Sequence, residues 1–219
     1  MNVASGPVTT PAHALEGLRR AIVAGELRPG QRVVQDDIAR QLGLSIAPVR
    51  EALRILEQEG QVTYVPRRGY FVTELRSEDL EEIYDLRRVL EERAVRDALP
   101  TLDAETLERI ELAAADCADA AERADIAGEL AANRRFHFAI FESPGQPHTI
   151  RVIRLLWDST EAYRALYYNS PAERHESLRA HDRIIAAVRA RDADRVVAAL
   201  DEHRERALEV LTGILSPPT

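Results

Sequence analysis

The 219-residue chain has a single cysteine, no lysine and few aromatic residues. The lone Cys117 excludes an internal disulfide, and with no base near it we expect an unreactive thiol in a reducing compartment. No apolar run reaches the roughly 20 residues that span a membrane, and no secretion signal opens the chain, so we expect a cytoplasmic protein with no membrane partner. All 29 basic residues are arginine. We attribute this to a GC-rich gene, so arginine content alone does not indicate nucleic-acid binding.

Charge divides the chain into two parts. Up to Arg76 there are 10 arginines against 8 acidic residues, a net charge of +2. The remainder has 19 arginines against 29 acidic residues, a net charge of −10, and the two parts give the total of −8. A slightly basic first part on an acidic second part fits DNA contact by the first part only.

The first part has the pattern of a winged helix-turn-helix. After a flexible arm at residues 1–10, apolar residues at helical spacing predict helices near 12–24, 35–42 and 45–59. Gly25, Gly43 and Gly60 end these helices. Two short strands around residues 62–64 and 70–72 then flank a wing at residues 66–69. We expect this domain to cover residues 11–74, followed by a linker at 75–76.

The third helix is the expected reader of DNA. Ser45 suits its N-cap, and Arg50 lies on the face opposite the apolar side, where it can reach base edges in the major groove. Arg54, Arg67 and Arg68 suit phosphates or, for the wing pair, the minor groove, and Gly69 lets the wing backbone approach DNA closely. A winged helix that contacts protein instead of DNA is the alternative.

Three segments of this domain resemble the GntR family of bacterial transcriptional regulators. They are GELRPG at 25–30, LSIAPVREALRILEQEG at 44–60 and RRGYFV at 67–72. The family usually has arginine and threonine where this chain has Ile46 and Ala47. The resemblance therefore implies that base recognition rests on Arg50 and on contact of Ile46 with thymine methyl groups.

From Ser77 onward the pattern is almost entirely helical. We predict six antiparallel helices near residues 77–98, 102–123, 125–142, 147–168, 171–190 and 192–213. They form an all-α bundle over residues 77–214, with a tail at 215–219. The fold class is therefore mainly α.

Three of the six histidines lie on apolar helix faces. His137, His181 and His203 come from three different helices and can meet in the bundle core. Three imidazoles suit Zn²⁺ or another divalent transition metal and leave positions open for a ligand. Hydrogen-bonded core histidines are the alternative. We expect the other three histidines to face solvent: His13, His148 and His175.

The segments around these histidines resemble the FCD effector domain that follows a GntR-type head. They are ANRRFHFAIF at 132–141, SLRAHDRIIAAVRARD at 177–192 and VVAALDEHRERAL at 196–208. The resemblance implies a metal, Zn, Ni or Mn, held by three histidines and an aspartate, at whose position this chain has Asn133. An amide brings no charge, so we expect weaker metal binding and a preference for an anionic effector. The count of six helices resembles the VanR-like branch of this FadR-type subfamily.

Arg87 shares a helix face with apolar residues and is expected to point inward, where it needs a partner. That partner is either Glu91, one turn further on, or the carboxylate of an effector held bidentately. Arg87, Leu90 and Glu91 match the RxxLE pattern, and the resemblance places this arginine at the effector pocket. Tyr163 is a further candidate for the pocket wall.

These observations favour a regulator and not an enzyme. We expect a homodimer that binds a roughly palindromic operator in double-stranded DNA, acts as a repressor, and responds to a small carboxylate at the metal site. Two alternatives remain: a metal-dependent hydrolase or lyase, which lacks a convincing general base, and a metal-free ligand sensor, which Asn133 favours.

Overall fold

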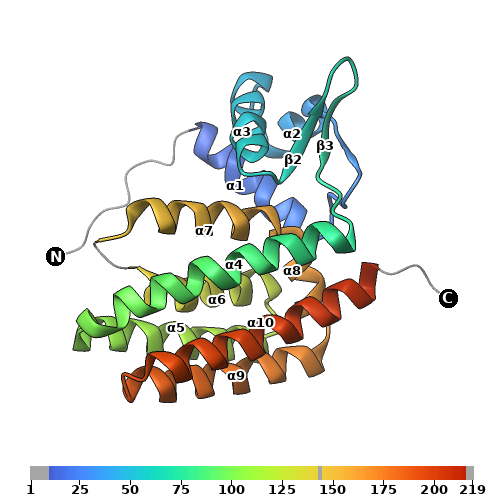
Figure 1. Cartoon of the computed structure of the whole chain (residues 1–219). Helices are drawn as coiled ribbons and strands as arrows, with labels where there is room; N and C mark the ends of the chain where they lie inside the picture. Colours follow the sequence, from blue (N-terminus) through green and yellow to red (C-terminus); the bar gives the residue numbers. More distant parts are fainter. Residues whose placement is uncertain (1–9, 143–144, 216–219) are drawn as a thin grey trace. The chain divides into compact units, whose positions relative to one another are not determined.

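The computed structural model describes residues 10–142 and 145–215. The chain divides into two compact units, the first ending at Glu74 and the second beginning at Leu75. Most of the expected arm (1–9), part of the tail (216–219) and Pro144 lie outside the described residues. Figure 1 labels the α-helices of both units and strands β2 and β3.

Within its described residues, 10–74, the first unit contains three helices and a small antiparallel sheet. In chain order the elements are α1 (Thr10–Val23), β1 (Arg32–Val33), α2 (Gln35–Leu42), α3 (Ile46–Gln58), β2 (Val62–Val65) and β3 (Gly69–Val72). The strand order is β1-β3-β2, and Tyr64 pairs with Tyr70 in the wing hairpin. The helices and the hairpin agree with the sequence pattern. Strand β1 was not predicted because two residues are too short to show an alternation.

Local sequence explains the turn between the two central helices. Gly43 ends α2 with φ +66°, a left-handed conformation that glycine adopts without steric cost. Ser45 then occupies the N-cap of α3 in an extended conformation. The apolar side of α3 packs into the core of this unit and leaves the opposite face in solvent, with Val49, Leu53 and Leu56 fully buried.

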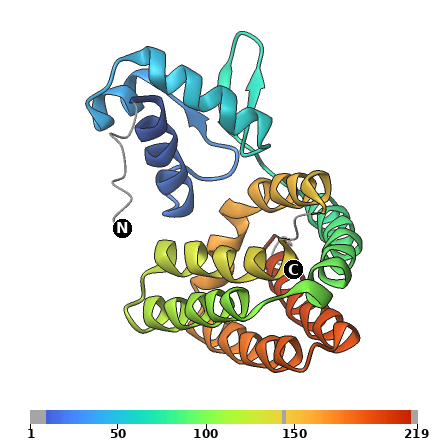
Figure 2. The same cartoon turned by 90° about the vertical axis from the view of Figure 1, so that its left-hand side faces the viewer.

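The second unit is a bundle of seven α-helices within its described residues. They are α4 (Ser77–Ala98), α5 (Ala104–Glu122), α6 (Ile126–Phe141), α7 (Pro147–Ser159), α8 (Glu161–Tyr168), α9 (Pro171–Arg189) and α10 (Ala193–Leu215), with a 3-10 turn at Leu99–Thr101 after α4. Figure 2 shows α5 beside α6 and α9 beside α10, and these pairs are in contact.

The prediction of six helices was wrong because residues 147–168 form two helices. Thr160 breaks the run with φ −106° and ψ 4°. The Ser159 hydroxyl donates to the Leu156 carbonyl at 2.9 Å, and the Thr160 hydroxyl donates to the Trp157 carbonyl at 3.2 Å. Such side-chain bonds compete with the helical ladder. The VanR-like assignment rested on the count of six and loses that support.

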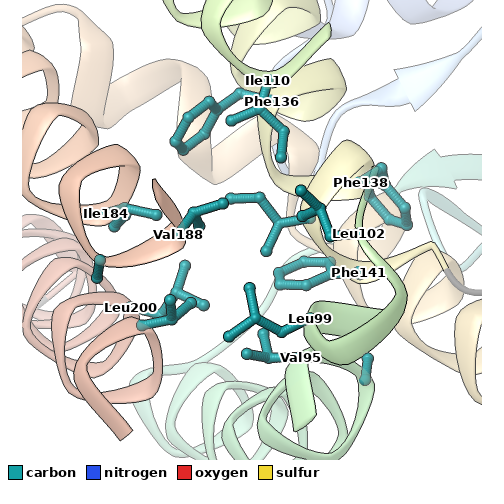
Figure 3. Packing of buried hydrophobic residues seen from close by; sticks show 14 of the residues in the cluster. Val95, Leu99, Leu102, Ile110, Phe136, Phe138, Phe141, Ile184, Val188 and Leu200 are labelled. Atoms are coloured by element: carbon teal, nitrogen blue, oxygen red, sulfur yellow. The ribbon is translucent and has the colours of Figure 1, made fainter. Parts of the chain in front are cut away.

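Aliphatic and phenylalanine side chains from α4, α5, α6, α9 and α10 fill the centre of the bundle. Figure 3 shows Phe136 and Phe141 of α6 among Val95, Ile110 and Val188. The core includes residues of α6, α9 and α10, and these are the helices that carry the three inward histidines. Within the described residues, no helix combines the length and apolarity needed to cross a bilayer.

Candidate functional site

The residues predicted to contact DNA lie at the surface of the first unit, on α3 and its N-cap and in the wing. Ser45, Ile46, Ala47 and the arginines of α3 and the wing are exposed, and Gly69 is partly exposed. Arg67 has φ +64° and Gly69 has φ +92°, which gives the wing its tight turn. The Arg68 guanidinium lies 5.2 Å from the centre of the Phe71 ring, so the base of the wing holds this arginine by a cation–π contact.

In the second unit, the three predicted histidines meet in the bundle interior. His137 of α6 and His181 of α9 are buried, and His203 of α10 is partly exposed. One ligand nitrogen from each ring lies within 4.8 Å of the other two. The rings of His137 and His203 stack with their centres 5.3 Å apart. The structure therefore brings together the set that spacing predicted.

Asn133 lies in the same cluster, one turn before His137 on α6. Its Oδ1 is 3.0 Å from Nε2 of His181, and the Asn133 side chain is fully buried. Nδ1 of His137, Nδ1 of His181 and Nδ2 of Asn133 have no hydrogen-bond partner among the described residues. Buried nitrogens without partners are costly, and a ligand or metal ion in the cluster would offset that cost.

The surroundings keep the three imidazoles neutral. Burial, reinforced by His203 and His181, holds the pKa of His137 well below its usual range, and burial does the same for the pKa of His181. Burial, together with the charges of Arg164 and Arg87, lowers the pKa of His203 to about 3. A neutral imidazole keeps a lone pair for a metal, so no proton has to leave before a metal binds at neutral pH.

The cluster fits a divalent metal by its donor set. Nitrogens bound to one tetrahedral zinc lie about 3.4 Å apart, since each is about 2.1 Å from the ion. Spacings of up to 4.8 Å require only a small inward rotation of the rings. His137, His181 and His203 would hold the ion, with the Asn133 oxygen as a neutral fourth donor.

Beside the histidines lies a small cavity of about 30 Å³. It has room for roughly two water molecules. Its walls combine two of the histidines, aromatic residues and charged groups: Tyr84, Arg87, Glu91, His137, Trp157, Arg164, Leu200, His203, Arg204 and Ala207. His203 also lines an outer groove of about 430 Å³ that includes residues of α8, α9 and α10. This histidine therefore stands between the cavity and the surface.

A buried ion cluster forms one wall of the cavity. Glu91 accepts from Nε of Arg87 at 2.8 Å, from Nε1 of Trp157 at 2.7 Å and from Nη2 of Arg204 at 2.8 Å. Burial alone would raise the pKa of Glu91, but Arg87 and Arg204 outweigh it and lower the pKa below its ordinary value. Arg204 also pairs with Asp201.

The larger hollow of this unit lies elsewhere. It has a volume of about 670 Å³ and is lined by residues of α5, α6 and α7, with no histidine among them. Arg154 in its wall is paired with Glu142, and Arg109 donates to Thr106. The larger hollow includes none of the three clustered histidines, so the smaller histidine cavity is the better candidate site.

Comparison with known proteins decides the family. The family of bacterial regulatory proteins called gntR matches residues 11–72, and the FCD domain matches residues 82–206, more than half of the chain. The chain belongs to the GntR family and carries an FCD domain. It is therefore a DNA-binding transcriptional regulator with an effector-binding helical domain, and not an enzyme.

Known GntR-type regulators match it along most of its length. McbR of Escherichia coli (strain K12) is 29% identical over 196 residues, 89% of each chain. The solved structure of E. coli McbR/YncC covers 95% of this chain and 100% of its own with a TM-score of 0.83. A putative GntR regulator from Rhodococcus sp. RHA1 has a TM-score of 0.78 at 26% identity, over 93% of this chain and 97% of its own.

Of the two residues predicted to bind an effector in this GntR-family regulator, Arg87 lines the cavity and Tyr163 does not. Arg87 points inward and lines the cavity, but it is paired with Glu91, the internal partner that the sequence left open. Tyr163 is not among the ten residues that form the cavity wall. Its hydroxyl accepts instead from the backbone N–H of Leu75 at 2.6 Å. Leu75 is the first residue of the helical unit.

Sequence reasoning missed two arginines of the cavity, Arg164 and Arg204. Arg204 directly follows His203 and is 7% exposed. Arg164 belongs to the short helix α8, whose other buried residues are tyrosines and an alanine. A lone charged residue among apolar neighbours was the signal that could have revealed it.

Helix α3 of this GntR-family head carries Arg50, which we predict to contribute to DNA affinity. We expect Arg50→Ala to weaken binding to an operator selected from a random-sequence library by about 5- to 150-fold, because one bidentate arginine–guanine contact contributes about 1–3 kcal/mol. Fluorescence anisotropy at fixed salt measures the effect.

Arg123→Ala, an exposed arginine of the helical unit, is the control and should bind as the unaltered protein does. If Arg50→Ala and Arg123→Ala bound the selected operator equally well, α3 would not be the base-reading helix.

Proposed function

We propose that this regulator is a metal-dependent sensor of a small carboxylate that represses transcription as a homodimer on a roughly palindromic operator. The observation that supports this most is the cluster of His137, His181 and His203. Their ligand nitrogens lie within 4.8 Å of one another beside a small cavity, and two of these side chains carry buried nitrogens without hydrogen-bond partners among the described residues. A divalent ion there would supply positive charge and an open position for a carboxylate oxygen.

The role proposed for Asn133 follows from its lack of charge. An aspartate would neutralise part of the charge of the ion, whereas the amide leaves it in place. The pocket is therefore more attractive to an anion and holds the metal less tightly. Zinc fits the nitrogen-rich donor set best, with Ni and Mn as the other candidates.

Control of DNA binding requires that the effector favours one arrangement of the heads over another. Helix α8 offers a route for this. Arg164 of α8 lines the cavity, and the preceding residue, Tyr163, holds the backbone of Leu75, where the helical unit begins. A carboxylate that shifts α8 would alter how this connection is held. We propose that such a shift releases the operator.

A metal-free sensor is the second candidate, and Asn133 favours it. In that case the Asn133 oxygen accepts from Nε2 of His181 and fixes the ring, and the polar side chains alone recognise the ligand. The two candidates differ in whether affinity for the ligand depends on the ion.

Metal analysis tests the proposal. We expect protein purified without chelator to contain about one divalent ion per chain and His181→Ala to lose it. We also expect Asn133→Asp to tighten the affinity at least tenfold, because a carboxylate adds charge to the site. Competition with a chromophoric chelator measures the affinity.

His175→Ala, which removes an exposed histidine of the same helix α9, is the matched control and should keep the metal. A wild-type protein that binds no added Zn²⁺, Ni²⁺ or Mn²⁺, with His181→Ala and His175→Ala indistinguishable, would favour the metal-free sensor.

A further inference from the structure

Arg164 is a buried arginine of the helical unit, and no carboxylate of the described residues forms an ion pair with it. Its side chain is 7% exposed, and its Nη1 has no hydrogen-bond partner among the described residues. Arg87 and Arg204 share Glu91, but Arg164 makes no ion pair within residues 10–142 and 145–215. The cavity wall thus holds three guanidinium groups and one carboxylate.

The position of Arg164 relates it directly to the histidines. Its guanidinium carbon lies 4.0 Å from the centre of the Trp157 ring, which is itself 5.1 Å from the ring of His137. After burial, the charge of Arg164 contributes most to the lowered pKa of His203. Arg164 therefore lies at the edge of the cavity that adjoins the proposed metal ligands.

A buried, uncompensated guanidinium is costly. The face of Trp157 offsets part of this cost by a cation–π contact, but an aromatic face accepts no hydrogen bond in the plane of the guanidinium. The planar N–H groups remain suited to a carboxylate, which they can bind through two parallel bonds. An anion in the cavity would supply the missing charge.

We propose that Arg164, and not Arg87, is the residue that binds the carboxylate of the effector. This inference rests on the function proposed above and assigns the ligand class as short-chain monocarboxylates. With about 30 Å³ of space and apolar walls at Leu200 and Ala207, the cavity has room for little more than a carboxylate group, so the acid must be short. A longer acid requires α8 to move outward. Arg87 remains paired with Glu91 and supports the wall.

Acetate is the probe for a test on the full chain, with and without bound metal. We expect sodium acetate to raise the melting temperature relative to sodium chloride at equal ionic strength. Arg164→Gln should weaken acetate binding at least tenfold, and Arg164→Lys should restore part of it. Arg88→Gln, an exposed arginine of α4, is the control and should respond as the wild type does.

A second readout separates ligand binding from a structural role. Removal of an uncompensated charge should leave the melting temperature in acetate-free buffer unchanged or raise it. A fall of more than about 5 °C would mean that Arg164 is a structural cation, and the inference would be wrong.

The inference would also be overturned if Arg164→Gln bound acetate as tightly as the wild type, if Arg87→Gln alone lost it, or if acetate did not stabilise the wild type. An acetate response that depends on Arg164 but persists in chelator-treated protein would support Arg164 and contradict the metal-dependent function.

Discussion

Glu91→Gln should destabilise the helical unit by about 3–5 kcal/mol, because it removes one partner of a buried ion cluster and leaves the others charged. Glu91 is 1% exposed and binds Arg87 and Arg204 together. Glutamine keeps the shape and one acceptor oxygen but not the charge. Arg87 and Arg204 would then share the interior with Arg164, with only the partly exposed Asp201 as a counter-charge.

Thermal and urea unfolding followed by circular dichroism measure this effect. For a chain of this size, the expected loss corresponds to a fall in melting temperature of roughly 10 °C. Because Arg87 and Arg204 lower the pKa of Glu91, its contribution is present above the ordinary pKa of a glutamate and is lost as the pH falls through the lowered value. Glu91→Gln should therefore differ most from wild type near neutral pH.

The neighbouring residue provides the control. Glu92 pairs with Arg96 on the surface, where the two side chains are 39% and 44% exposed. Glu92→Gln should change stability by less than about 1 kcal/mol. Equal stability of Glu91→Gln and Glu92→Gln would show that the buried cluster contributes no net stabilisation.

The sequence predicted which residues face inward but not which residues they meet. Periodicity placed His137, His181 and His203 on apolar faces, and the bundle brings them together. Periodicity also predicted that Arg87 points inward. Whether Glu91 or an effector is its partner depends on the contact of Glu91 with Arg204, which is 113 residues away in the chain. Contacts between distant helices leave no trace in the spacing of one helix.

Helix boundaries were predicted from the sequence only where they depend on local residues. Glycines at helix ends predicted the helix-turn-helix well, because their conformations are local. The break at Thr160 was missed because serine and threonine interrupt a helix only when their hydroxyls bond to its carbonyls. That break creates α8, and with it the placement of Arg164 at the cavity and of Tyr163 at Leu75.

Glu129→Gln should stabilise the protein above neutral pH, in contrast to Glu91→Gln. Glu129 of α6 is 1% exposed, and neither of its carboxylate oxygens has a hydrogen-bond partner among the described residues. Burial, with Asp125 nearby and only Arg174 opposing, raises the pKa of Glu129 to about 7. The folded protein thus binds a proton that the unfolded chain releases near pH 4.3.

The direction of the pH dependence follows from this difference. A carboxyl group with a raised pKa contributes its full stabilisation at pH values below the ordinary pKa of glutamate. That stabilisation is lost as the pH rises toward 7. Glutamine does not titrate and resembles the protonated acid. The advantage of the variant over wild type should grow by about 2–3 kcal/mol between pH 5 and pH 8, since each pKa unit corresponds to about 1.4 kcal/mol.

Urea unfolding of both proteins between pH 5 and pH 8 isolates this group, because every other titration is common to the two. Glu108→Gln on the exposed face of α5 is the control and should follow the wild-type curve throughout. If the curves of Glu129→Gln and wild type ran parallel, the Glu129 carboxylate would have to be ionised and solvated in the folded state. A gap that widens from pH 5 toward pH 7 and then levels off requires that the fold favours the neutral form of this buried acid.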